Sequence, residues 1–178
     1  MEQLLDVGRP APGPGGRWLV RLAEWFALAG GAIFVGIAIM SVLSIAGRAL
    51  FSKPLSGDYE LVQVGCAVFV ALCLPICQLR RGNIIVDFFT TRLSLPVQRR
   101  LDAIGALALA LAMSLVAWRV CVGTIDMRAA GETTTILGWP VWWTYAAMIP
   151  GVALTAVAGF YTAIERLREA ARLADRAS

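Results

Sequence analysis

The sequence predicts an all-α integral membrane protein with four transmembrane helices, and three observations lead to this fold class. First, 58% of the 178 residues are hydrophobic and only 16% are charged, whereas soluble domains are about a quarter charged. Second, the apolar residues form four uncharged blocks, and a helix needs about 20 such residues to cross a hydrocarbon core of roughly 30 Å. Third, Arg and Lys are divided unevenly among the segments that connect these blocks.

The first three blocks give three spans directly or with a small extension. Residues 25–47 and 61–79 are long enough to cross a membrane without any charged residue. The third block, 103–118, is short, so its span needs Arg119 to snorkel to the outer interface. With that extension the third span covers about 101–123.

The fourth block, 133–164, is longer than one span. Its three threonines indicate a loop, and a helix is expected to begin near Trp139 and Pro140, because proline is tolerated in a first helical turn. We therefore expect a membrane domain over 21–165, with spans at about 25–47, 61–79, 101–123 and 140–164, a disordered tail at 1–20 and a helical tail at 166–178.

Orientation follows from the positive charges. Four spans place the two tails and the central loop on one side, and these segments carry 12 of the 16 Arg and Lys residues, against 4 on the other side. Because positive side chains are retained in the cytoplasm, both termini and both tails are expected to be cytosolic (N-in, C-in). The first block is 23 residues long, longer than the apolar region of a usual signal peptide, so it is expected to persist as a helix.

The central loop contains a candidate interfacial helix. Within residues 83–95, Asp87, Thr90, Thr91 and Ser94 recur at helical spacing and form one polar face, with apolar residues opposite. Such a pattern favours a short helix lying in the inner membrane interface. An irregular hydrophobic loop is the alternative. The outer loops, 48–60 and 119–139, are too short for a domain, so any large substrate-binding module must be a separate chain.

Several classes of function are disfavoured by what the sequence lacks. There is no histidine, which excludes His-ligated metal centres and His-based acid–base catalysis. The expected spans hold no ionisable residue in their interiors, whereas transporters usually mark their ion path with such groups. Cys66, Cys73 and Cys77 share a helix face without a Cys-x-x-Cys motif, so they are expected to be small apolar residues. We predict no catalytic residue, no cofactor, no metal site and no nucleic-acid partner.

Small residues recur at four-residue spacing in several spans. Pairs such as Ala106 with Ala110 and Ala108 with Ala112 permit close helix approach. In the third span they occupy more than one face, which is typical of a helix with more than one neighbour. Packing inside the four-helix bundle accounts for part of this pattern.

Three motifs resemble one known family. Arg48-x-x-Phe51-x-x-Pro54-Leu55, followed by Glu60-Leu61, resembles its first outer loop, and Arg81-Gly82-Asn83-Ile84-Ile85-Val86-Asp87 resembles its inner loop. Leu137-Gly138-Trp139-Pro140-x-Trp142, with Ile149-Pro150-Gly151 after it, resembles the entry to its fourth span. The family is the small membrane subunit (DctQ type) of tripartite ATP-independent periplasmic (TRAP) transporters. One departure is Asn83, where the family often has histidine.

The resemblance covers about residues 25–165 and implies a bacterial inner-membrane complex. A periplasmic substrate-binding protein would capture an organic acid and dock on the outer face. A large multi-span subunit would carry the acid inward by an elevator motion driven by sodium, as a symporter. The small subunit would contact membrane lipids and support the large subunit without catalytic activity. The motif positions carried over as structural or partner-facing are Arg48, Pro54, Glu60, Gly82, Asp87, Pro140 and Trp142.

Two further interpretations stay open at this point. The small subunit of a tripartite tricarboxylate transporter has a similar plan, and a self-assembling four-helix scaffold or channel would also use small-residue faces. An autonomous membrane enzyme, such as a quinone-linked thiol oxidase, would need paired cysteines in a periplasmic loop, and the four cysteines lie in or near spans.

Overall fold

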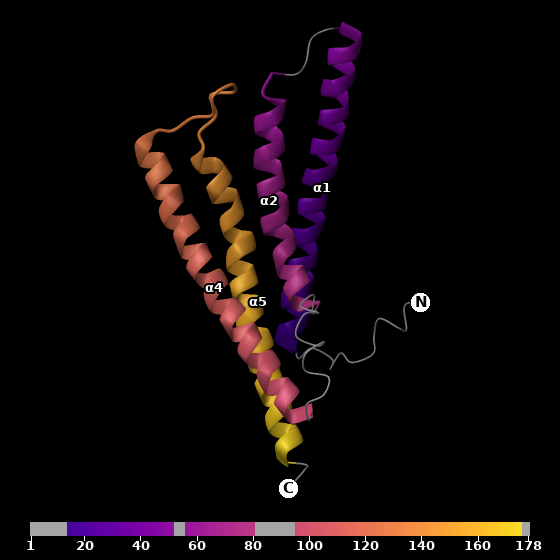
Figure 1. Ribbon diagram of the computed structural model, residues 1–178, viewed down its shortest axis with the longest axis vertical. Helices are drawn as coiled ribbons and strands as arrows, with labels where there is room; N and C mark the ends of the chain where they lie inside the picture. Colours follow the sequence, from indigo (N-terminus) through magenta and orange to yellow (C-terminus); the bar gives the residue numbers. More distant parts are fainter. Residues whose placement is uncertain (1–13, 52–55, 81–94, 176–178) are drawn as a thin grey trace.

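The computed structural model describes residues 14–51, 56–80 and 95–175, and these residues form four long helices (Figure 1). Each helix is long and apolar enough to cross a membrane. The predicted all-α class, with four helices able to span a membrane, is therefore confirmed for the described residues, whose only β-type pairing is an isolated bridge. The helices are α1 (Pro14–Phe51), α2 (Asp58–Leu79), α4 (Leu95–Ala130) and α5 (Trp142–Asp175).

Helix α1 begins earlier than expected. We expected a disordered tail over 1–20, but residues 14–20 form the first turns of α1, and residues 1–13 lie outside the described residues. The proline at position 14 suits a first turn, where its missing N–H is no loss. Leu19 is buried in a cluster with Ala158, so packing against α5 stabilises this extension.

Helix α4 ends later than expected. It starts at Leu95, before the expected start near residue 101, and it continues to Ala130, beyond the expected end near residue 123. Gly131 stops it in a left-handed conformation with φ 66°. The amides of Gly131 and Glu132 donate to the carbonyl oxygens of Arg128 and Met127, which is the Schellman pattern. The helix therefore extends until a glycine permits this cap.

Helix α5 is the central helix of the chain. It packs on α4 and α2 and touches α1, and α1 packs mainly on α2 (Figure 1). About half of the apolar window of α5 is buried, compared with 6% for α1 and 11% for α4. The chain thus forms two helical hairpins joined through α2 and α5, with α1 and α4 at the periphery.

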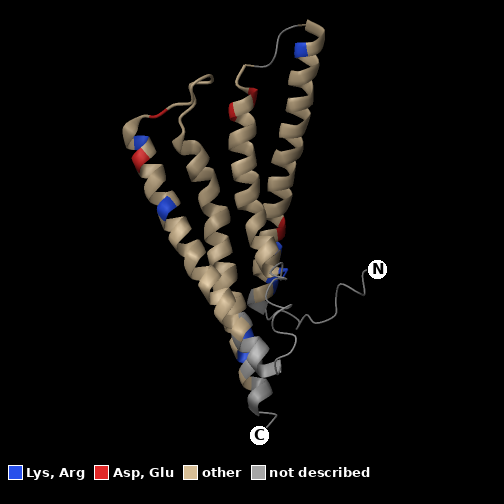
Figure 2. Cartoon of the chain, viewed as in Figure 1, with Lys and Arg blue, Asp and Glu red and all other residues tan. Residues whose placement is uncertain are grey.

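The antiparallel hairpins define two ends. We call the end where α1 finishes, α2 begins and residues 131–141 connect α4 to α5 the loop end. The opposite end, where α1 begins and α5 finishes, is the terminal end (Figure 1). Charged residues gather toward these two ends and leave long uncharged stretches between them, although α4 carries charges further from its loop end than the other helices do (Figure 2).

Small residues bring α5 close to both neighbours. Gly151 lies against the backbone of Ala71 in α2, and a Cβ atom at Gly151 would overlap the Ala71 carbonyl. A Cβ atom at Gly159 would lie 2.9 Å from the Cβ of Ala110 in α4. Contacts this short need residues without bulky side chains, so the positions of these glycines set the register between helices.

Candidate functional site at the loop end of the helices

Four of the seven motif positions lie among the described residues, and all four are at the loop end. Arg48 is in the last turn of α1 and Glu60 in the first turn of α2. Pro140 and Trp142 lie where the α4–α5 loop meets α5. Pro54, Gly82 and Asp87 lie outside the described residues, and so does the predicted interfacial helix at 83–95, except for Leu95, which begins α4.

Glu60 fastens the α4–α5 loop to α2. One carboxylate oxygen accepts a hydrogen bond from the amide of Ile136 at 2.8 Å, and the other accepts one from the amide of Leu137 at 3.0 Å. The side chain of Leu137 lies against Gly57, which precedes α2 with φ 81°. Any Cβ atom at Gly57 would collide with Leu137. The Glu60 carboxylate in α2 and Gly57 just before α2 therefore hold Ile136 and Leu137 in place. These two loop residues lie more than 70 positions later in the sequence.

The loop itself is compact because it closes on its own backbone. The amide of Thr134 donates to the carbonyl of Trp139 at 2.8 Å, and the Thr134 hydroxyl oxygen accepts from the Trp139 amide at 3.1 Å. Gly138 supplies the left-handed turn, with φ 66°. Pro140 pairs with Thr133 in the isolated bridge. Residues 139 and 140 therefore belong to the loop, and α5 begins two residues later than the expected start at 140.

Aromatic side chains cover the junction of the loop with α5. The guanidinium of Arg128 stands 5.1 Å from the ring centre of Trp142, and Trp142 meets Trp143 edge to face at 6.0 Å. Trp139 and Ile136 expose more than half of their surface. Exposed tryptophans at the end of an apolar helix are typical of the membrane–water interface.

A second polar contact closes the α1–α2 hairpin. The hydroxyl of Ser44, which is buried, donates to the carboxylate of Asp58 at 2.6 Å, and that carboxylate also accepts from the Tyr59 amide at 2.8 Å. Arg48 lies one helical turn beyond Ser44 and is exposed. This contact was not predicted from the sequence. The available signal was an acidic residue at the start of α2 together with Ser41 and Ser44 near the end of α1.

Arg119 lies deeper in its helix than the sequence indicated. We expected it near the end of the third span, and α4 continues for 11 residues beyond it, to Ala130. The side chain of Arg119 is exposed. Because a helix can continue beyond the membrane, the expectation that the spans hold no interior charge stays a prediction. Gly131, which ends the helix, was the sequence signal for its length.

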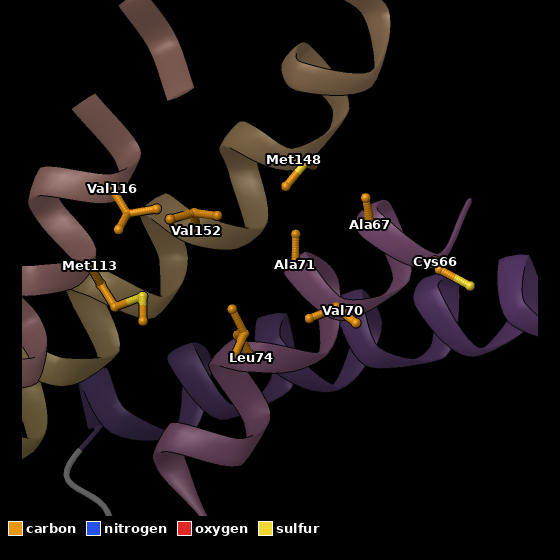
Figure 3. A pocket seen from close by; sticks show the side chains of 9 residues that line it. All are labelled: Cys66, Ala67, Val70, Ala71, Leu74, Met113, Val116, Met148 and Val152. Atoms are coloured by element: carbon orange, nitrogen blue, oxygen red, sulfur yellow. The ribbon is translucent and has the colours of Figure 1, made fainter. Parts of the chain in front are cut away.

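An apolar groove runs between the two hairpins at mid-length. It has a volume of about 430 Å³ and is formed by side chains from α2, α4 and α5 (Figure 3). The lining includes Val70, Leu74, Met113, Val116, Met148 and Val152. The lining residues include no charged side chain and no side-chain nitrogen or oxygen atom, and the thiol of Cys66 is only a weak donor. The groove therefore suits apolar groups and has no side chain that would pair with the carboxylate of an organic acid.

The chain matches one family of known proteins. The family model described as "Tripartite ATP-independent periplasmic transporters, DctQ component" matches residues 37–169, which is most of the chain. The match includes all four described motif positions and the whole α4–α5 loop. No curated protein and no solved structure matches the chain.

Proposed function

Because the chain belongs to the DctQ family, the small component of TRAP transporters, we propose that it is the non-catalytic membrane subunit that packs on and supports the large transport subunit. The chain is a multi-pass membrane protein with four apolar helices. In the proposed complex the large subunit moves an organic acid by an elevator motion coupled to sodium. A periplasmic binding protein delivers the acid.

The two small-residue faces of α4 are the observation that carries this proposal. One face, with Ala103, Ala106 and Ala110, is buried in the chain, where Ala110 meets Gly159 of α5. A second face, with Ala108 and Ala112, is exposed. Small residues permit close approach of a further helix, which lipid tails do not require. The exposed face of α4 is therefore suited to a helix of another subunit.

The groove and the charge distribution support a non-transporting role. The groove between the hairpins has no charged side chain and no side-chain nitrogen or oxygen atom in its lining. A path for an organic anion and sodium would need oxygen ligands and cationic groups inside the spans. Arg119 of α4 is the exception among the described residues, and it is not in the lining of the groove. The other polar groups of this kind lie toward the two ends of the helices (Figure 2), so substrate passage is assigned to the large subunit.

We infer that the protein resides in the bacterial inner membrane with both termini in the cytoplasm. The segments joined to the terminal end hold 12 of the 16 Arg and Lys residues, and positive residues favour the cytoplasmic side. The loop end then faces the periplasm, where the loop fastened by Glu60 is available to the binding protein. In this arrangement residues 83–95 form the interfacial helix on the cytoplasmic side.

The test is purification of the tagged chain in mild detergent from cells that also express the TRAP large subunit of the same organism. The expected result is recovery of both chains in a fixed ratio, with organic-acid uptake in liposomes that requires the large subunit and sodium. Uptake by the small chain alone would contradict its supporting role. Recovery of the small chain only as a homo-oligomer would favour the self-assembling scaffold instead.

A further inference from the structure

The most unusual charged residue in the described part of the chain is Arg119. Its side chain is exposed on α4, beside Leu115 and Trp118, which expose 57% and 61% of their surfaces. Among the described residues it takes part in no hydrogen bond and no ion pair; the ion pair that is observed joins Arg80 to Glu24 at the terminal end. Arg119 therefore has no anionic neighbour among the described residues.

Helix contacts place Arg119 at mid-depth. Helices α4 and α5 are antiparallel and meet where Ala110 contacts Gly159 and where Gly123 lies against Tyr145. Arg119 lies nine residues after Ala110 in α4, and Pro150 lies nine residues before Gly159 in α5. Because Ala110 meets Gly159 and the two helices are antiparallel, Arg119 and Pro150 lie at the same level along the pair.

The same reasoning connects Pro150 to α2. Helices α2 and α5 run in the same direction and touch where Gly151 meets Ala71. Pro150 is therefore level with Val70, which is the central residue of the uncharged segment 61–79. The guanidinium is attached at the middle of the apolar layer that α2 defines.

That depth decides which anions can reach Arg119. The centre of a hydrocarbon core lies about 15 Å from either boundary, whereas an extended arginine side chain reaches only about 6 Å from its Cα atom. Snorkelling to lipid phosphates thus falls short without thinning of the bilayer. Asp126, the nearest acidic residue on the same face of α4, is seven positions away, about 10 Å along the axis, and forms no ion pair with Arg119.

We propose that Arg119 forms an ion pair inside the membrane with a carboxylate on a transmembrane helix of the large subunit, packed on the exposed face of α4. This inference rests on the proposed function, because it names the contact through which the two subunits recognise each other. Ala112 and Ala108 precede Arg119 by seven and eleven residues and so share its face. Their short side chains allow the partner helix to come close enough for the pair to form.

The experiment compares two conservative changes with a matched control. Arg119→Gln removes the charge but keeps a polar side chain, Arg119→Lys keeps the charge, and Arg21→Gln neutralises an exposed arginine at the terminal end of α1. Each tagged variant is purified with the large subunit in mild detergent. Arg119→Gln is expected to lower the recovered large subunit at least about tenfold, because the partner carboxylate stays buried and unpaired. Arg119→Lys and Arg21→Gln should recover near wild-type amounts.

A charge exchange identifies the partner group. Arg119→Glu should abolish recovery, and exchange of one Asp or Glu in a span of the large subunit for Arg should restore it. Wild-type recovery by Arg119→Gln, or failure of every acidic position to rescue Arg119→Glu, would overturn the ion pair.

Two further outcomes separate the alternatives. Loss of the wild-type complex on reconstitution into nanodiscs of zwitterionic phosphatidylcholine, without anionic lipid, would assign the contact to the headgroup of an anionic lipid, against the proposal. If the wild-type chain does not recover the large subunit at all, the proposed function fails, and the inference fails with it.

Discussion

At the level of single residues, Glu60 is a motif position whose side chain has a structural role, because it holds a loop in place. Both of its carboxylate oxygens accept backbone amides from the α4–α5 loop. A backbone amide without an acceptor is costly only where water is excluded, and Ile136 is exposed. The contact therefore contributes mainly by holding the loop in one conformation above α2.

Replacing Glu60 by Gln should loosen the loop. The amide oxygen of Gln can accept from one of the two backbone donors, but its NH₂ group cannot accept from the other. We expect faster hydrogen exchange in peptides that contain Ile136 and Leu137, with little change elsewhere, measured by mass spectrometry in detergent. Glu132→Gln is the control, since Glu132 is exposed in the same loop. Unchanged exchange in the Glu60 variant would mean that loop closure by Thr134 is sufficient.

At the level of elements, α5 owes its central position to small residues on two of its faces. Gly151 admits the backbone of α2, and Gly159 admits Ala110 of α4. Larger side chains at these points would separate helices that meet through their backbones, because a main-chain carbonyl cannot rotate away as a side chain can. The packing of the two hairpins thus depends on particular glycines more than on overall hydrophobicity.

Replacing Gly151 by Ala should destabilise the chain. The added methyl group overlaps the Ala71 carbonyl, and overpacking of this kind typically costs about 1–3 kcal/mol. The expected result is a lower midpoint of thermal unfolding for the isolated chain in detergent. Gly31→Ala provides the matched control, because a methyl group there meets nothing within 4 Å. Equal unfolding midpoints for the two variants would show that α2 and α5 can move apart at Gly151 without loss of folding free energy.

At the level of the whole molecule, the distribution of buried surface is uneven. Half of the apolar window of α5 is buried, but α1 and α4 remain largely exposed along their length. In a membrane, lipid tails cover such surfaces without penalty, so exposure alone does not identify an interface. The combination of small residues and Arg119 on one face of α4 distinguishes that face from the exposed aliphatic residues of α1.

Ala108→Trp should weaken assembly with the large subunit while leaving membrane insertion intact. Ala108 is exposed on α4 and makes room for a close neighbour, so an indole ring would hold the partner helix away. We expect at least a severalfold lower yield of the complex in mild-detergent purification. Ala49→Trp, at an exposed alanine near the loop end of α1, should leave the yield unchanged. A normal yield from the Ala108 variant would exclude this part of α4 from the interface.

The proposed orientation leads to a prediction about the ends of the chain. A fluorescent protein fused after Ser178 should be fluorescent and an alkaline phosphatase fused there inactive, because both reporters would remain in the cytoplasm. Fusion after Ser56, at the loop end, should give the opposite pair of signals. An active phosphatase after Ser178 would reverse the orientation and place the Glu60 loop in the cytoplasm.

Much of the architecture could be read from the sequence because the membrane itself imposes it. Uncharged runs such as 25–47 and 61–79 have no other stable environment, so their number gave the number of helices. The order of three motifs likewise identified the family that the comparison with known proteins supports. The predicted helix boundaries were less accurate where a charged residue lies within a helix, as at Arg119. A charged side chain is unfavourable in lipid, but it does not end the backbone hydrogen bonding of the helix.

The relations between distant segments became visible only in the folded chain. Glu60 and Ile136 are 76 positions apart, and neither residue type carries information about the other. The depth of Arg119 likewise depends on where Gly159 meets Ala110 and where Gly151 meets Ala71. The sequence by itself determined which segments enter the membrane, since that depends on the transfer of each segment from water to lipid. Register and loop contacts depend on how several helices fit together, and this is a property of the assembled chain.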